Sequence, residues 1–266
     1  MTTMLPVENL PVLQLNDITL DYGSGKRAKR VLHGVSLTVG RGETLGLVGE
    51  SGSGKTSIAK IVLGLQKPTS GAITFQGHDL VAANRPTRRL LSSRLQVVFQ
   101  DPYSSLNPTR RIGASIAEPL SFGFPNLTRS EVAAKVADML EKVGLPADAA
   151  SRYPSQFSGG QRQRIGIARA LIVSPDLVVC DEPVSALDLS VQAQILNLLA
   201  ELQEQTGVSY LFIAHDLSVV QFLSHRVAVM EQGRIVETGT VEQVYGAPQS
   251  GYTQRLLNAI PNPEPV

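Results

Sequence analysis

The sequence predicts an α/β fold in which helices flank a mainly parallel sheet. Three observations support this prediction. Short apolar runs alternate with helix-like stretches along most of the chain, the pattern of strands joined by crossover helices. Several of these runs, such as "TLGLVG" and "SYLFIA", are continuously apolar, as in strands covered on both faces. Turn-rich and helical sequence interrupts the alternation over residues 101–156, which indicates a helical insertion.

The first hundred residues are expected to hold a loose lead-in, an N-terminal antiparallel β part and the first helix. Alternating apolar and polar side chains in "VLQLNDITLDY" predict a half-buried strand, and the apolar run in "KTSIAKIVLGL" predicts a helix. In chain order, we expect the lead-in over residues 1–11, a strand over 12–22, two strands within 30–49, a helix over 55–65, and strands over 71–80 and 94–100.

After the insertion, strands and helices alternate again. The clearest inserted helix begins at Thr128, a plausible N-cap that Glu131 completes as a capping box. A hairpin is expected to turn at Gln232 and Gly233. In order, we expect helices over 128–145 and up to residue 171, a strand over 176–183, a helix over 190–207, a strand over 209–216, the hairpin over 225–239, and a short helix in the tail 248–266.

Composition limits the classes of function. The 266 residues carry a net charge of +1, so no bulk attraction to nucleic acid is expected, and the basic residues 25–30 read as a solvated hairpin tip. The single cysteine, Cys180, leaves no internal disulfide or cysteine-built metal site, and we expect it to pack as a small hydrophobe. We see no signal peptide and no run of about 18 apolar residues. Any membrane part would therefore come from another chain.

The segment "GESGSGKT" fits the phosphate-binding pattern G-x-x-x-x-G-K-[ST] and lies between a buried strand and an apolar helix, as that motif requires. Its backbone N–H groups would surround the β- and γ-phosphates of a nucleotide, Lys55 would add a charge, and the Thr56 hydroxyl would bind Mg²⁺. A plain glycine-rich turn is the weaker alternative. The residues assigned to this loop are Gly49, Glu50, Ser51, Gly52, Ser53, Gly54, Lys55, Thr56 and Ser57.

Polar residues follow three other buried strands. Asp181 ends "LVVCD" and would help to hold Mg²⁺, while Glu182 directly after it is a candidate to polarise the attacking water. Gln100 and His215 end "LQVVFQ" and "LFIAH", where they could reach the γ-phosphate, Gln100 through metal or water. Taken alone, each could also be a polar residue that closes a strand. We expect the remaining histidines to lie in surface loops or turns: His33, His78 and His225.

A second glycine turn, "SGGQ", opens the helix that ends at residue 171. Free N–H groups and the helix dipole make such a helix start a place to hold an anion, although the chain already has one phosphate loop. The residues concerned are Ser158, Gly159, Gly160 and Gln161.

In this order and spacing, the phosphate loop, Gln100, "SGGQ", "VVCDE", "SALD" and His215 resemble the nucleotide-binding domain of ABC (ATP-binding cassette) transporters over residues 12–262. The resemblance implies a P-loop NTPase core with a helical subdomain inserted at about 101–170, and ATP and Mg²⁺ as ligands. It implies that "SGGQ" contacts the ATP of a second cassette, that Asp188 lies in the loop crossing this dimer interface, that Glu182 is the catalytic base and that His215 is the switch residue. Tyr22 would stack on adenine, although an ordinary strand tyrosine fits the sequence equally well.

Three further stretches look like the oligopeptide, dipeptide and nickel import branch: "FQDPYSSLNP", "DEPVSALDLSVQAQILNLL" and "GYTQRLLNAIPNPEP", the last within a tail at 247–266. Many ATPases of that branch carry a longer, cysteine-containing tail with an iron–sulfur cluster. Because Cys180 is the only cysteine here, we expect no cluster. The order "GKTS", where "GKST" is commoner, keeps the hydroxyl at Thr56.

The resemblance therefore predicts an ATPase that powers import of peptides, or alternatively of nickel or another small solute. Its implied partners are two integral-membrane permease subunits, a second ATP-binding subunit (identical or paralogous) and an extracytoplasmic solute-binding protein. Its implied place is the cytoplasmic face of the bacterial inner membrane. The competing hypotheses are an exporter cassette, a non-transport cassette that acts on DNA ends or ribosomes, and a P-loop kinase or GTPase, which would not need "SGGQ".

Overall fold

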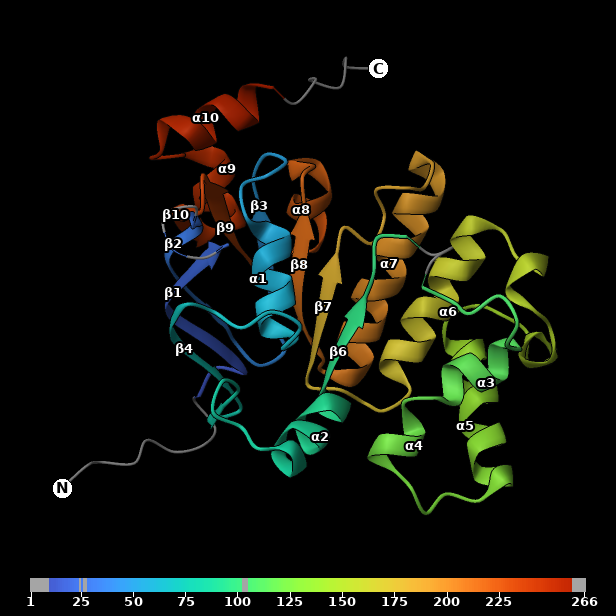
Figure 1. The fold of residues 1–266 in the computed structure, drawn as a ribbon. Helices are drawn as coiled ribbons and strands as arrows, with labels where there is room; N and C mark the ends of the chain where they lie inside the picture. Colours follow the sequence, from blue (N-terminus) through green and yellow to red (C-terminus); the bar gives the residue numbers. More distant parts are fainter. Residues whose placement is uncertain (1–9, 24, 26–27, 102–104, 260–266) are drawn as a thin grey trace, which may run out of the picture. The chain divides into compact units, whose positions relative to one another are not determined.

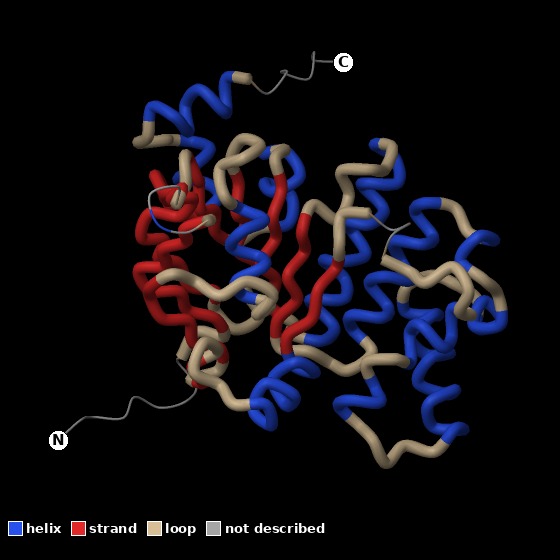
Figure 2. Tube along the Cα trace, viewed as in Figure 1, coloured by secondary structure: helices blue, strands red, loops and turns tan. Residues whose placement is uncertain are grey.

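The computed structural model describes residues 10–23, 25, 28–101 and 105–259 (Figure 1). The chain divides into two units, residues 1–82 with 209–266, and residues 83–208. Most of the expected lead-in, part of the basic stretch 25–30 and the proline-rich end of the tail lie outside the described residues. Figure 2 shows that strands dominate the first unit and helices the second.

The first unit contains the expected antiparallel part. Four strands pair in the order β2-β1-β4-β5. Along β1, alternate side chains such as Leu13, Leu15 and Leu20 are buried, as the alternation in sequence predicts. The strands are β1 (Leu13–Tyr22), β2 (Lys29–Val39), β4 (Ser70–Phe75) and β5 (His78–Asp79).

The same unit holds strands that pair in the order β10-β9-β3-β8. Strand β3 is buried at every residue and runs parallel to both β8 and β9. The hairpin between β9 and β10 turns at Gln232 and Gly233, both with positive φ, which confirms the predicted turn. The strands are β3 (Thr44–Val48), β8 (Ser209–Ala214), β9 (Arg226–Glu231) and β10 (Arg234–Thr240).

Among its described residues, the first unit contains the helices α1 (Lys55–Val62), α8 (Leu217–Leu223), α9 (Val241–Gly246) and α10 (Gly251–Asn258). Helix α10 confirms the helix expected in the tail. Helix α1 ends before the predicted residue 65 because the chain turns at Gly64, whose φ is +70°. The sequence reading missed α8 and α9, two short helices whose first turns are capped by Asp216 and Thr240.

The second unit combines a parallel strand pair with the inserted helices. Strands β6 (Leu95–Val98) and β7 (Leu177–Asp181) pair in register, with Val98 opposite Cys180. The predicted capping box of Thr128 and Glu131 is present at the start of α5. The helices are α2 (Arg85–Arg94), α3 (Ile112–Ala117), α4 (Leu120–Gly123), α5 (Arg129–Lys142), α6 (Gly159–Leu171), α7 (Leu189–Thr206) and the 3₁₀ turns η3 (Ala147–Ser151) and η4 (Pro154–Gln156).

The predicted loop or turn positions of two histidines are wrong. His33 lies within β2 and His78 within β5, because strand pairing extends through both positions. Cys180 is fully buried on β7, and burial raises the pKa of its thiol, as expected of a packed and unreactive side chain. Within the part of the chain that the structure describes, no helix is both long and apolar enough to cross a bilayer.

Candidate active site

The loop of residues 49–54 joins β3 to α1 in the first unit. Its three glycines have φ values of +154°, +82° and +111° at Gly49, Gly52 and Gly54, which L side chains rarely adopt. A Cβ at Gly49 would lie 2.1 Å from the carbonyl oxygen of Met230, so a side chain has no room there. The motif spacing thus reflects real steric demands of the loop.

Lys55 begins α1 and is buried. Its ammonium donates to the carbonyl oxygens of Gly49 at 2.6 Å and Glu50 at 2.9 Å, so the loop folds around this charge. No side chain caps the first turn of α1. The helix therefore begins with backbone N–H groups and a positive dipole end beside Lys55, an arrangement suited to phosphate. Thr56 presents an exposed hydroxyl on the same turn.

The loop is supported from behind by distant parts of the first unit. The N–H of Gly233, at the tip of the β9–β10 hairpin, donates to the carbonyl of Ser53 at 2.9 Å. The N–H of Glu50 donates to the hydroxyl of Tyr252 in α10 at 3.0 Å. Neither support was predicted, because the loop and its partners are far apart in sequence.

His215 lies at the same sheet edge as the phosphate loop. Val48 of β3 stands opposite Ala214 of β8 in a parallel register, so Gly49 and His215 both follow directly after their strands. The His215 side chain is exposed. Tyr22 ends β1 with its side chain 41% exposed, which leaves the ring open to a ligand.

In the second unit the structure brings Gln100 and Glu182 together. The amide of Gln100 donates to the carboxylate of Glu182, with 3.2 Å between Nε2 and Oε2. Strand β7 ends at Asp181, and Glu182 turns away with φ at +49°, an uncommon value for a residue with a side chain. This left-handed step lets two successive carboxylates leave the strand in different directions, and the half-buried Asp181 stays with the strand end.

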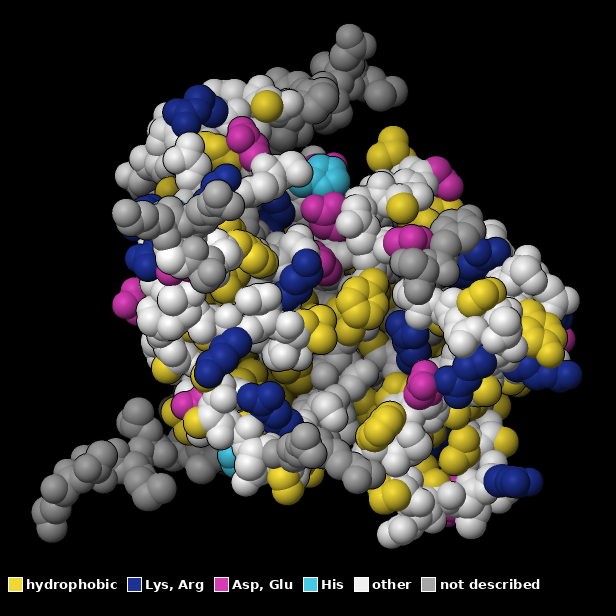
Figure 3. Space-filling model, viewed as in Figure 1, with side chains coloured by type: hydrophobic (Ala, Val, Ile, Leu, Met, Phe, Trp, Pro, Cys, Tyr) yellow, Lys and Arg dark blue, Asp and Glu magenta, His cyan; other side chains and the backbone are white. Residues whose placement is uncertain are grey.

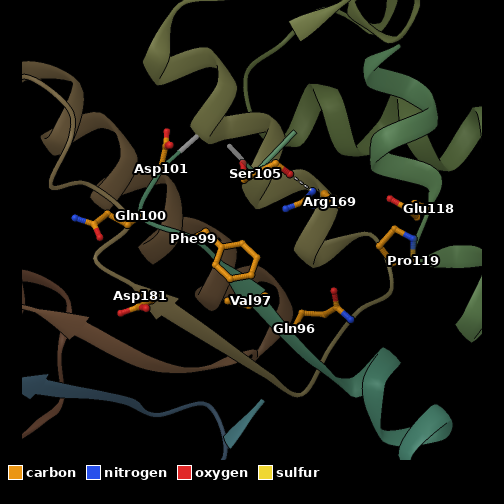
Figure 4. Close-up of a pocket in the computed structure, with 10 residues that line it drawn as sticks. All are labelled: Gln96, Val97, Phe99, Gln100, Asp101, Ser105, Glu118, Pro119, Arg169 and Asp181. Carbon is orange, nitrogen blue, oxygen red and sulfur yellow. Dashed lines mark hydrogen bonds between the residues drawn. The ribbon is translucent and has the colours of Figure 1, made fainter. Parts of the chain in front are cut away.

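Asp181 and Gln100 also line a cavity of about 610 Å³ in the second unit (Figure 4). Figure 4 shows the ring of Phe99 in its middle and Arg169 on the far side, where the guanidinium donates to the carbonyl of Ser105. Burial lowers the pKa of Arg169, while the negative charge of Glu118 raises it. The cavity thus offers an aromatic surface beside a cation. It is lined by Gln96, Val97, Phe99, Gln100, Asp101, Ser105, Glu118, Pro119, Arg169 and Asp181.

The "SGGQ" turn begins α6 with a capping box. Gln161 N–H donates to the Ser158 hydroxyl at 3.3 Å, and the Ser158 N–H donates to the Gln161 side chain at 3.0 Å. A Cβ at Gly160 would lie 2.5 Å from Cγ1 of Val191 in α7. The spacing S-x-x-Q carried the signal for this box, but the contact with Val191 could not be read from sequence.

Asp188 lies at the start of α7, next to the "SGGQ" turn through Val191. Its carboxylate accepts from the N–H of Val191 at 3.0 Å and from the Ser190 hydroxyl at 2.7 Å. These hydrogen bonds, the Ser190 hydroxyl first, lower the pKa of Asp188. Asp188 therefore serves as a charged N-cap of α7. Its position directly before the helix indicates this role, which was not predicted.

The exposed side chains of both units are mixed in charge and type. On the face shown in Figure 3, Lys and Arg side chains (dark blue) are interspersed with Asp and Glu (magenta) and with scattered hydrophobic side chains (yellow). The exposed hydrophobic residues of the second unit include Phe99, Phe122 and Phe124.

Comparison with known proteins gives consistent matches. The family described as "ABC transporter" matches residues 32–185. The oligopeptide transport ATP-binding protein OppF of Escherichia coli (strain K12) is 50% identical over 263 residues, which cover 98% of this chain and 79% of that protein. The dipeptide transport ATP-binding protein DppF of Haemophilus influenzae is 49% identical over 264 residues, covering 97% and 80%.

Solved structures match with similar coverage. A dimeric post-hydrolysis state of the ATP-binding cassette MJ0796, bound to ADP and Pi, aligns with a TM-score of 0.76 at 28% identity, over 86% of this chain and 98% of that one. The structure of cbiO1 from Clostridium perfringens, part of the transporter complex cbiONQ, aligns with a TM-score of 0.77 at 28% identity, over 89% and 91%.

Proposed function

The chain belongs to the ABC transporter family, and from that membership we propose that it is the ATP-hydrolysing subunit of an importer for oligopeptides or dipeptides. The family assignment makes the chain an ATP-binding ATPase. The observation that carries the choice of solute is the likeness, along nearly the whole chain, to proteins named for oligopeptide and dipeptide transport. Residues 12–262 would form the nucleotide-binding domain, with residues 101–170 as its helical subdomain.

The phosphate loop would hold ATP. Its N–H groups and the start of α1 would surround the phosphates, and Lys55, positioned by its bonds to the Gly49 and Glu50 carbonyls, would present its charge to the phosphate oxygens. Tyr22, exposed at the end of β1, would stack on the adenine ring.

Three side chains offer the hard oxygen donors that Mg²⁺ prefers: the exposed Thr56 hydroxyl, the Asp181 carboxylate and the Gln100 amide oxygen. Each of these side chains is of a kind that binds Mg²⁺, which when bound would neutralise charge on the transferred phosphate. The Gln100 amide can serve in this way because its nitrogen, not its oxygen, is the atom that contacts Glu182.

Glu182 would act as the base that orients and polarises the attacking water. Its carboxylate is fixed by two features, the left-handed backbone at residue 182 and the hydrogen bond from Gln100. His215, beside the phosphate loop at the ends of β3 and β8, would donate a hydrogen bond to the γ-phosphate. The hydrolysis step is in-line attack of this water, with ADP as the leaving group.

A second cassette, identical or paralogous, would complete each site. The start of α6, where Ser158 and Gln161 are exposed and Gly159 and Gly160 half-buried, would face the ATP held by the partner, and Asp188 would lie at that interface. ATP binding would then close the two chains together, and hydrolysis would let them part. The dimeric state named for the solved cassette MJ0796 supports this proposal.

Two permease subunits would receive the motion, together with an extracytoplasmic solute-binding protein, which would place the chain at the cytoplasmic face of the bacterial inner membrane. The cavity lined by Phe99, Gln100 and Arg169 is the best candidate for docking a permease segment. Because Gln100 also contacts Glu182, a partner seated there would be coupled to the hydrolytic residue through one side chain.

Uptake of labelled dipeptide and of nickel should be compared in a strain lacking this chain, complemented with wild type or Glu182→Gln. Restoration of dipeptide uptake by wild type alone supports the proposal. Restoration of nickel uptake alone would support the nickel alternative, and restoration of neither would overturn both dipeptide and nickel as the solute. Affinity purification gives a second test, because integral-membrane partners are expected, whereas ribosomes or DNA would contradict the proposal.

A further inference from the structure

The tail helix α10 contacts the phosphate loop through one side chain. The N–H of Glu50 donates to the Tyr252 hydroxyl at 3.0 Å, across a sequence separation of 202 residues. Tyr252 is buried, although it lies in a helix of only eight residues. Figure 1 shows α10 (red) beside the loop that joins β3 to α1 within the first unit.

The position of Tyr252 is set by hydrogen bonds around the start of α10. The Glu237 carboxylate on β10 accepts from the N–H groups of Gln249 at 2.8 Å and Ser250 at 3.0 Å. The Ser250 hydroxyl in turn caps the N–H of Tyr252 at 3.2 Å. The beginning of α10 is thus anchored to the strand β10, and this anchor aims the tyrosine ring at the loop.

The outer side of the ring is held as well. The Arg255 guanidinium lies 5.7 Å from the centre of the Tyr252 ring and reaches the Glu231 carboxylate at 3.4 Å. Glu231 ends β9 directly after Met230, and the carbonyl oxygen of Met230 lies close to Gly49. The contacts of α10 with Glu237 and with Glu231 are therefore both made with the β9–β10 hairpin, which also supports the phosphate loop.

The N–H that Tyr252 contacts belongs to the same peptide group whose carbonyl accepts a hydrogen bond from Lys55. A peptide unit is planar, so the carbonyl of Gly49 and the N–H of Glu50 move together. Tyr252 holds the N–H of this unit, and Lys55 donates to its carbonyl at 2.6 Å. Gly49, at φ +154°, has no Cβ to limit rotation of the unit, and the hydrogen bond to Tyr252 restricts that rotation from outside the loop.

We propose that Tyr252 is a positioning residue for nucleotide binding: its hydroxyl fixes the Gly49–Glu50 peptide unit and thereby the starting position of the Lys55 ammonium. The tail helix α10 is then a working part of the nucleotide site. This inference rests on the proposed role of the phosphate loop in binding ATP. Burial raises the pKa of the Tyr252 hydroxyl.

The test uses Tyr252→Phe in the full chain, because phenylalanine keeps the ring and its contact with Arg255 but removes the oxygen. We expect MgATP to bind about fivefold to tenfold more weakly, the effect of one lost hydrogen bond. We also expect faster hydrogen exchange in the nucleotide-free loop at residues 49–54. In hydrolysis assays the KM for ATP should rise by a similar factor, with kcat within about twofold of wild type.

Tyr245→Phe is the matched control. Tyr245 belongs to α9 in the same unit, and its part-buried hydroxyl donates to the backbone carbonyl of Leu217 at the start of α8. This variant also loses one tyrosine hydroxyl bond, yet it should leave MgATP affinity, KM and exchange of the loop at wild-type values.

The experiments distinguish failure of the nucleotide role of the loop from failure of the positioning role of Tyr252. If wild type does not bind MgATP, or if Lys55→Ala binds it equally well, the nucleotide role of the loop is wrong. If wild type binds, Lys55→Ala does not, and Tyr252→Phe matches wild type in affinity and loop exchange, the positioning role alone is overturned. An equal loss of thermal stability in both Phe variants, with unchanged affinity in both, would likewise reduce Tyr252 to a packing residue.

Discussion

Replacing Gly160 by alanine tests why the "SGGQ" turn needs its second glycine. The new Cβ would lie 2.5 Å from Cγ1 of Val191, about 0.9 Å closer than ordinary van der Waals contact. Val191 is β-branched and lies in the first turn of α7, where one χ1 rotamer is strongly preferred, so rotation of the side chain gives little relief. The start of α7, including the Asp188 cap, must therefore move away from α6.

The cost follows from this overlap. Overpacking by one methyl group typically costs about 1–3 kcal/mol in the free energy of unfolding. Val191→Ala removes the clashing carbon, so the double variant Gly160→Ala/Val191→Ala should return to within about 1 kcal/mol of wild type. Gly166→Ala is the matched control in the same helix. A Cβ there meets no atom of the described residues within 4 Å, and alanine should stabilise the helix by about 0.5–1 kcal/mol.

Denaturant unfolding measures the stability, and MgATP binding and ATP turnover measure the function. The Cβ at Gly160 points at Val191, so it would displace the start of α7 and not the phosphate loop. We therefore expect the single variant to bind MgATP normally but to lose turnover, and the double variant to recover turnover. A stable double variant without turnover would refute the packing argument, since the methyl group itself would then block what the turn binds. Weakened MgATP binding by the single variant would assign the turn to the chain's own site.

Three further variants test the remaining site residues. Glu182→Gln should bind ATP and accumulate as a dimer, measured by gel filtration, while turnover falls at least about a hundredfold, as for loss of a general base; normal turnover would contradict the assignment. Lys55→Ala should lose most MgATP binding by calorimetry, and retained tight binding would exclude the phosphate role. Gly49→Ala should lose binding and also about 1–3 kcal/mol of stability, because its Cβ would lie 2.1 Å from the Met230 carbonyl; wild-type affinity there would show that the loop tolerates a side chain.

The parallel strands and their polar ends could be predicted because both signals are local. Continuous apolar runs predicted β3, β6, β7 and β8, and strand ends collect at one edge of a parallel sheet. Within each unit the registers agree with this: Val48 stands opposite Ala214 in the first unit, and Val98 stands opposite Cys180 in the second. The roles of those residues stay predictions until variants are assayed.

The short helices were missed because apolar periodicity is weak over one or two turns. Helix α2 was not predicted either: its ten residues include few apolar ones, and its clearest sequence signals are the Asn84 cap, whose side chain accepts from Thr87, and a proline in its first turn. The same kind of signal was available for Asp188 and for the S-x-x-Q box at Ser158. Reading caps as carefully as apolar runs would have found α2 and the capping roles of Ser158 and Asp188.

Tyr252 could not have been found in this way, and the reason also predicts the size of its effect. A motif specifies the atoms that meet the ligand, because those atoms lie within a few residues of one another, but the contacts that hold the motif come from wherever the fold brings a partner. Lys55 would give phosphate a full charge, whereas Tyr252 gives one neutral hydrogen bond to the peptide unit beside it. Loss of Lys55 should therefore remove most binding, and loss of the Tyr252 hydroxyl should only weaken it. A screen for complete loss of function would detect the motif and overlook the tail helix, so the contribution of α10 has to be sought in KM and in the exchange rates of the loop.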